Sequence, residues 1–239
     1  DEEESNLLMA AVQNKIVPVD VFQFLIDQGI DINARDKYGA TVLHYVYQDI
    51  DKLRFLLDAG VDVNTRRLSE TPLMKAVSNE FNIEIIKLLI NYGAEIDCIS
   101  YGSNALGGFL DIDSFNKTPL MVAVQYQLNP VIIELLIQSG ANVSYVNPDN
   151  DMDCLLYAVK NGSDPQIIQW LLEAGAQPNL LDFEGKSALF YAEENGYSAE
   201  LINTFNQLIP YAQTLEDQTG VYSAPGLGTK CVATYSINK

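Results

Sequence analysis

Two stretches decide the fold of this chain: Thr118-Pro119-Leu120-Met121-Val122-Ala123 and Leu135-Leu136-Ile137-Gln138-Ser139-Gly140-Ala141-Asn142-Val143-Ser144. The first is typical of a helix start, because the threonine oxygen can accept an unpaired backbone N–H and proline is tolerated at the first helical position. The second is typical of a helix end, because glycine readily adopts the positive φ at which many helices terminate. An apolar stripe of Val131, Ile132, Leu135 and Leu136 leads into the second stretch. These features predict a pair of short helices.

Both stretches recur in register along the chain. The helix start returns at residues 6–11, 41–46, 71–76, 153–158 and 187–192, and the helix end returns at residues 24–33, 56–64, 88–97 and 171–179. The glycines of the five helix ends are 31, 33, 47 and 35 residues apart. Two short helices cannot bury their apolar faces alone, so this period predicts a stack in which each helix pair covers its neighbour.

The pattern resembles the ankyrin-repeat family, whose unit contains a T-P-L-H-x-A helix start and a G-A-D-V-N helix end. The resemblance covers about residues 5–210 as six units. It implies an all-α fold, an ankyrin-repeat solenoid of about six repeats, in a domain that spans residues 1–210. The match is strongest in repeats 2, 3 and 4 and weakest in repeat 1.

The array departs from the family pattern at two positions of the repeat. The family's helix-start histidine is present only as His44. The loop glycine that precedes the first helix is present as Gly39 and Gly185, whereas the same position holds Ser69, Asn116 and Asp151 in other repeats. The sequence therefore reads as a degenerate natural array.

Two segments lie outside the repeat pattern. An insertion at about residues 98–113 separates repeats 3 and 4, and we weigh two roles for it: partner binding, or a neutral extension of a loop. The extension at residues 211–239 has β-prone runs at Val221–Ser223 and Cys231–Ile237 around a Pro-Gly turn, so a C-terminal β-hairpin is expected. It could cap the last repeat, begin a further domain or pair with another chain, and we favour the cap.

The charge of the chain restricts its partners. Its 32 acidic and 14 basic residues give a formal net charge of −18, spread along the sequence with one dense run at residues 1–4. A chain this acidic repels phosphate groups, so we expect no nucleic-acid or membrane partner. We expect a monomer that binds a protein partner, and the total charge favours a basic one. The charge could also serve solubility alone.

The sequence holds few of the residues that catalysis or metal binding needs. His44 is the only histidine, which excludes most histidine-based metal sites and catalytic triads. The three cysteines are scattered and form no CxxC pair, so we expect neither a disulfide framework nor a zinc site. We therefore expect no enzyme activity, no catalytic residues, no metal and no cofactor. A reducing compartment follows: the cytoplasm, the nucleus, or a host cytosol if the protein is a secreted effector.

In the ankyrin family, partners usually lie across the concave face made by the hairpin tips and the first helices. Matched position by position, the resemblance implies a partner-binding set of Lys37, Tyr38, Arg67, Leu68, Ser114, Phe115, Lys117, Gln125, Tyr126, Asn150, Met152 and Phe183. Aromatic and long apolar side chains recur in this set, and such residues are enriched at interface hot spots. The few cations gather at the same positions: Arg35, Lys37, Arg66, Arg67 and Lys117. These cations favour a partner segment that carries acidic residues, whereas the total charge favours a basic partner. The sequence leaves both alternatives open.

These features support three functional hypotheses. The leading one is an adaptor or scaffold that binds a partner polypeptide on the concave ankyrin groove. The second is an inhibitor, immunity protein or antitoxin that occludes a basic enzyme, with the acidic charge as the working feature. The third is the recognition region of a larger effector enzyme. The fold supports each only by analogy, because fold alone does not fix function.

Overall fold

The computed structural model describes residues 7–46, 49–67, 70–100 and 116–208 of the 239-residue chain. Its contacts divide the chain into two compact units, Asp1–Phe115 and Asn116–Lys239, which we describe separately. The regular elements of the described residues are helices, joined by turns and by three isolated β-bridges. None of these helices has the length and apolarity needed to cross a membrane. The expected insertion and the expected C-terminal hairpin fall mostly or wholly outside the described residues.

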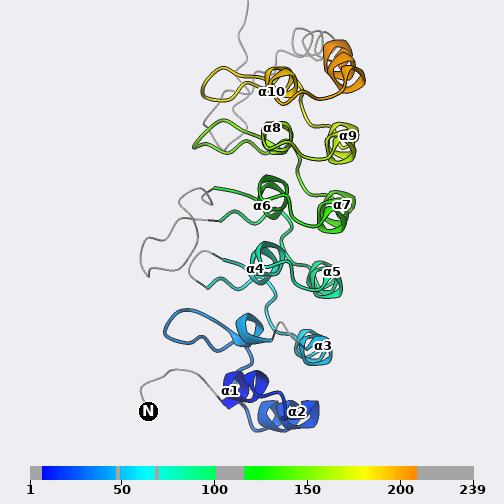
Figure 1. The fold of residues 1–239 in the computed structure, drawn as a ribbon. Helices are drawn as coiled ribbons and strands as arrows, with labels where there is room; N and C mark the ends of the chain where they lie inside the picture. The colour runs from blue at the N-terminus through cyan, green and yellow to red at the C-terminus, as the bar shows by residue number, and fades with distance from the viewer. Residues whose placement is uncertain (1–6, 47–48, 68–69, 101–115, 209–239) are drawn as a thin grey trace, which may run out of the picture. The chain divides into compact units, whose positions relative to one another are not determined.

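The first unit contains three helix pairs, which form repeats 1 to 3 (Figure 1). Their elements are α1 (Leu7–Gln13), α2 (Val19–Asp27), the short 3-10 helix η1 (Val42–Tyr45), α3 (Ile50–Asp58), α4 (Pro72–Ser78) and α5 (Ile83–Asn91). Helix α1 packs on η1, and α2, α3 and α5 pack on one another in that order. The first helices and the second helices of the repeats therefore make two adjacent rows.

The second unit repeats this arrangement for repeats 4 to 6. Its elements are α6 (Pro119–Gln125), α7 (Pro130–Gln138), α8 (Cys154–Lys160), α9 (Pro165–Glu173) and α10 (Ala188–Glu194), followed by a helix whose described part is 199–208. Helix α8 lies between α6 and α10, and α7 packs on α9. The predicted helix pairs are thus present in both units.

The helix starts are capped as their sequence predicts. The side-chain oxygens of Thr71, Thr118, Asp153 and Ser187 each accept a hydrogen bond from the backbone N–H three residues later. Pro72 and Pro119 stand at the first turn of their helices. These contacts satisfy donors that a helix N-terminus otherwise leaves unpaired, so the caps fix where each first helix begins.

Left-handed backbone ends the second helices and shapes the loops. Gly93 and Gly140, like the other helix-end glycines, have φ near +87°. A Cβ added at either would meet no atom within 4 Å, so the backbone angle, and not crowding, requires glycine there. Asn116 and Asp151, which replace the loop glycine, keep its conformation with φ of +54° and +55°. Asparagine and aspartate tolerate this region better than other side chains do.

Each unit has its core between the two helix rows. The fully buried side chains include Phe22, Leu53, Leu56, Ile86 and Leu89 in the first unit and Leu120, Ile133, Leu136, Leu155 and Ile168 in the second. The apolar stripe predicted for α7 is partly wrong, because Val131 is exposed and Ile133 is buried in its place. Helix α5 has the same phase, since Ile85 and Ile86 stand three and four residues after its N-cap Asn82 and are buried, as Ile132 and Ile133 are after Asn129.

Candidate protein-binding surface

The extended segments that precede the first helices, here called fingers, are tied to those helices by side chains. In finger 34–40, one carboxylate oxygen of Asp36 accepts the backbone N–H groups of Tyr38 at 2.8 Å and Ala40 at 2.9 Å. Its other oxygen accepts the hydroxyl of Tyr45 in η1. Burial raises the pKa of Asp36, but these hydrogen bonds outweigh it and hold the pKa below its usual value. The fingertip is therefore fixed against η1.

The same anchor recurs in repeat 6. Asp182 accepts the backbone N–H groups of Glu184 and Lys186, both at 2.9 Å, and the Tyr191 hydroxyl of α10 at 2.6 Å. Burial and this carboxylate raise the pKa of Tyr191, so the phenol stays protonated and donates. In both repeats the aspartate precedes the tyrosine by nine residues, a signal in the sequence that our reading of it missed.

Repeat 5 uses amides in place of the carboxylate. The Tyr157 hydroxyl of α8 accepts the side-chain N–H groups of Asn150 at 2.8 Å and Asn147 at 3.2 Å. The Asn147 oxygen accepts the backbone N–H of Asp149 at 2.9 Å. Finger 145–152 is thus held by a tyrosine at the same helix position, but here the tyrosine hydroxyl accepts hydrogen bonds instead of donating one.

The anchored finger of repeat 2 presents an aromatic ring between two cations. The Tyr38 side chain is 41% exposed. The Lys37 ammonium lies 5.2 Å from its ring centroid, and the guanidinium carbon of Arg67, from finger 65–70, lies 5.9 Å from it. Both distances suit cation–π contacts. Three of the predicted residues are therefore brought together into one patch, which we call the Tyr38 patch.

Behind the Tyr38 patch lie half-buried charges of repeat 3. Burial raises the pKa of Glu70, and the nearby cations Lys75 and Arg67 oppose that shift. Burial also lowers the pKa of Lys75, which Glu70 partly offsets. His44 lies among these groups, and burial together with the charge of Lys75 lowers its pKa to about 4. The histidine is thus neutral at pH 7, and the region keeps a positive balance.

The second unit carries exposed aromatic side chains among acidic residues. Phe183 at the tip of finger 180–186 is 65% exposed, and Tyr126 at the end of α6 is also exposed. Gln125 lies beside Tyr126 and is half-buried; its backbone carbonyl accepts the Asn161 side chain at 3.1 Å. Asp149 and Glu184 stand exposed on the neighbouring fingers. This unit therefore presents Phe183 next to the acidic Glu184, while Lys186 pairs with Glu184 at 2.8 Å and lies 5.2 Å from the ring centroid of the exposed Phe190.

Two predicted residues have almost no surface to offer a partner. Lys117 is 2% exposed, and its ammonium lies 5.2 Å from the Tyr157 ring centroid. Met152 is 2% exposed and forms an isolated β-bridge with Asn147 inside its finger. Asn150 is half-buried and engaged with Tyr157. The predicted residues Leu68, Ser114 and Phe115 lie outside the described residues.

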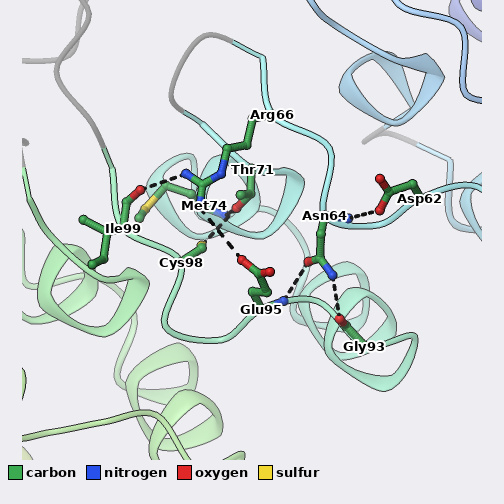
Figure 2. A network of polar contacts seen from close by, with 9 residues as sticks. All are labelled: Asp62, Asn64, Arg66, Thr71, Met74, Gly93, Glu95, Cys98 and Ile99. Atoms are coloured by element: carbon green, nitrogen blue, oxygen red, sulfur yellow. Dashed lines mark hydrogen bonds and ion pairs between the residues drawn. The ribbon is translucent and has the colours of Figure 1, made fainter. Parts of the chain in front are cut away.

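Arg35 and Arg66 connect successive repeats of the first unit. The Arg35 guanidinium donates to the backbone carbonyl of Arg66 at 3.1 Å. Figure 2 shows the next step, in which Arg66 donates to the carbonyl of Ile99 at 2.9 Å and faces the Glu95 carboxylate at 3.9 Å. Two of the cations counted with the fingers therefore serve the stack of repeats.

Polar contacts near the Arg66 link strengthen the same junction. The Asn64 side chain accepts the Glu95 N–H at 2.8 Å and donates to the Gly93 carbonyl at 3.0 Å (Figure 2). The Thr71 hydroxyl and the Cys98 thiol lie 3.0 Å apart, and burial raises the pKa of that thiol. Cys98 is thus a packed, protonated thiol. Within the described ranges, no cluster of three or more histidine, cysteine or acidic side chains is arranged to hold a metal ion.

Comparison with known proteins agrees with these features. The family model described as "Ankyrin repeats (3 copies)" matches residues 1–67, 48–147 and 120–213. The chain belongs to the ankyrin-repeat family. The predicted all-α ankyrin-repeat fold is confirmed, and ankyrin repeats make the chain a protein-interaction module. None of the curated proteins searched matches it.

Several solved structures share this ankyrin fold. An ankyrin repeat domain from Acinetobacter baumannii AYE is 27% identical with a TM-score of 0.64, over 86% of this chain and 97% of that one. A chain from a Bdellovibrio bacteriovorus predatory endopeptidase in complex with an immunity protein is 24% identical with a TM-score of 0.59, over 89% and 99%. The ankyrin repeat domain of Bcl-3, of the IkappaB family, is 24% identical with a TM-score of 0.64, over 86% and 87%.

Proposed function

We propose that this ankyrin-repeat chain is an intracellular adaptor or scaffold that binds a partner polypeptide with its fingertips and the adjoining first helices. The observation that carries this proposal is the anchored finger with an exposed aromatic tip, seen at Tyr38 and Phe183. A ring already held in place loses little conformational freedom on binding, and such residues are enriched at interface hot spots. The buried free thiols Cys98 and Cys154 suit a reducing compartment.

For the first unit we propose a partner segment that carries a carboxylate beside an apolar residue. The Tyr38 patch offers an aromatic face flanked by the Lys37 ammonium and the Arg67 guanidinium. A guanidinium pairs well with a carboxylate, while the ring favours an apolar neighbour. The total charge of −18 favours the opposite partner charge, but contacts within a few ångströms outweigh distant charges that salt screens.

Display selection of random peptides on the intact chain, followed by affinity measurements with purified winners, tests the proposal. We expect selected peptides to contain acidic residues next to apolar ones. Tyr38→Ala and Arg67→Ala should each weaken the binding of such a peptide by about tenfold or more. Phe24→Ala and Val131→Ala are matched controls, because they remove exposed apolar side chains from second helices and should leave the affinity unchanged. Equal affinity of all four variants would refute the fingertip surface.

The acidic total charge favours one alternative function, an inhibitor, immunity protein or antitoxin that occludes a basic enzyme. The second unit would suit this role, because the fingertip acids Asp149 and Glu184 stand beside exposed aromatic side chains. Binding driven by these acids should weaken steeply with added salt. Tight, salt-sensitive binding to one cationic enzyme, unaffected by Arg67→Ala, would favour this alternative over the adaptor.

A further inference from the structure

The fourth residue of the helix-start motif is uncovered only at the last described repeat. Met9, His44, Met121 and Leu156, each followed by another repeat of its own unit, are at most 2% exposed. Phe190 occupies the same position in α10 and is 44% exposed. Helix α10 packs on α8, and the described part of the chain holds no repeat after repeat 6. Phe190 therefore lies where a following repeat would cover it.

A second exposed apolar side chain of repeat 6, Leu181 in finger 180–186, lies on the same side of the repeat as Phe190. Arg35 and Arg66 each stand six residues after a helix-end glycine, and each donates to the backbone of the next repeat. Leu181 stands six residues after Gly175 and is 51% exposed. Its side chain carries no hydrogen-bond donor. The finger and α10 thus place two large apolar side chains on the side where the next repeat belongs. We call Leu181 and Phe190 the C-terminal stacking face.

We propose that residues 209–239 of this chain cover the C-terminal stacking face in place of a seventh repeat. The segment directly follows helix 199–208 of repeat 6, whose side chains Leu201 and Phe205 are buried. At about 3.3 Å per residue, its length is ample to cross one repeat. Its runs Val221–Ser223 and Cys231–Ile237 are apolar and β-prone. Such residues favour the extended backbone with which one finger pairs with the next.

Charge supports this occupant over a second copy of the chain. In a chain whose net charge is −18, segment 209–239 is formally neutral: Lys230 and Lys239 balance Glu216 and Asp217, and the part after Asp217 holds no acidic residue. The repeat 6 elements that flank the stacking face are acidic: Asp182, Glu184, Glu193 and Glu194. At the edge of the face, the Lys186 ammonium lies 5.2 Å from the Phe190 ring centroid and pairs with Glu184 at 2.8 Å. Two acidic copies would repel each other, whereas the formally neutral segment 209–239 is not repelled, and its two lysines are attracted to these acidic residues.

Amide hydrogen exchange of the full chain, followed by mass spectrometry, tests the proposal. We expect peptides from at least one of the two apolar runs to exchange about tenfold or more slowly than an unstructured peptide. The double variant Leu181→Ser, Phe190→Ser should remove this protection, whereas Phe24→Ser on α2 should keep it. Exchange at the unstructured rate in the unmodified chain, or protection that survives the double variant, would overturn the proposal. So would protection that appears only when light scattering shows a dimer, because a second copy would then be the occupant.

Thiol reactivity gives a second readout in the same chain. Cys98 and Cys154 are at most 3% exposed, so Cys231 is the thiol that reports on the C-terminal segment. We expect one thiol of the double variant to react about tenfold faster than any thiol of the unmodified chain, with helix content unchanged by circular dichroism. Equal rates, together with unprotected amides, would place the segment away from the stacking face.

Discussion

At the scale of single residues, His44 and Asp153 carry opposite pKa shifts that have one cause. Both belong to helix-start motifs, and both are at most 2% exposed. Burial disfavours the charged form of each, so it lowers the pKa of His44 to about 4 and raises the pKa of Asp153 to about 7. The two side chains should therefore give the stability of the protein opposite dependences on pH.

His44 should make the first unit less stable in acid. Its folded pKa lies below the unfolded value of about 6.5, so its contribution is complete above pH 6.5 and is lost as the pH falls towards 4, by up to about 3 kcal/mol. Replacing it by the methionine found at this position in repeats 3 and 4 removes the titrating group. Urea midpoints measured from pH 4 to 8 should fall less in His44→Met; identical slopes for the two proteins would contradict the shift.

Asp153 should destabilise the second unit above neutral pH. One carboxylate oxygen caps α8 by accepting the Leu156 N–H at 2.8 Å, and the other has no hydrogen-bond partner among the described residues. Its raised pKa gives stability that is present below pH 4 and lost as the pH rises through 7. Asp153→Thr keeps the cap and removes the charge, so it should raise stability at pH 8 by roughly 2–4 kcal/mol. Thermal melts at pH 5 and pH 8 should show the gain mainly at pH 8.

At the scale of elements, the turn after the first helix has left-handed backbone in repeats 3 to 6. The residue concerned is Gly162 in repeat 5 and Gly196 in repeat 6, with φ of +71° and +68°. Repeats 3 and 4 hold Glu80 and Gln127 there, at +47° and +52°. Side chains with a Cβ adopt this region at a cost of about 1 kcal/mol or more. These two repeats therefore store strain that a glycine would relieve.

Glu80→Gly should stabilise the first unit by about 0.5–1 kcal/mol, because relief of the strain exceeds the backbone entropy that glycine adds to the unfolded chain. Glu80→Ala is the matched control: it removes the same carboxylate but keeps the Cβ. Denaturant unfolding of the three proteins would distinguish the causes. A gain in the alanine variant equal to that in the glycine variant would assign the effect to charge instead.

The sequence predicted the helices and turns better than it predicted which side chains are exposed and which hold the fingers. Caps at Thr71 and Thr118 and the turn at Gly140 follow from local chemistry, which the residues themselves specify. The burial of Lys117 could not be predicted, because it depends on the Tyr157 ring of the following repeat. The tyrosine anchors of the fingers were also missed, since they join positions nine or ten residues apart that only the folded hairpin brings together.

At the scale of the whole molecule, the net charge of −18 should make stability depend on salt. Like charges repel most in the compact state, and salt shortens the range of that repulsion. We expect the melting temperature to rise by several degrees as NaCl is raised from about 10 mM to about 500 mM. Replacing the exposed pair Glu193 and Glu194 by glutamine should reduce this rise. A melting temperature that is flat or falls with salt would show that ion pairs outweigh the repulsion.

The finger anchors have a consequence for how recognition can change. Asp36 and Asp182 face their tyrosines from inside the finger, while Tyr38 and Phe183 stand beside them at the tip. A mutation at the tip alters what the surface presents and leaves the anchor untouched. Substitution of one or two tip residues, by evolution or by protein engineering, can therefore change the binding specificity while the scaffold stays the same.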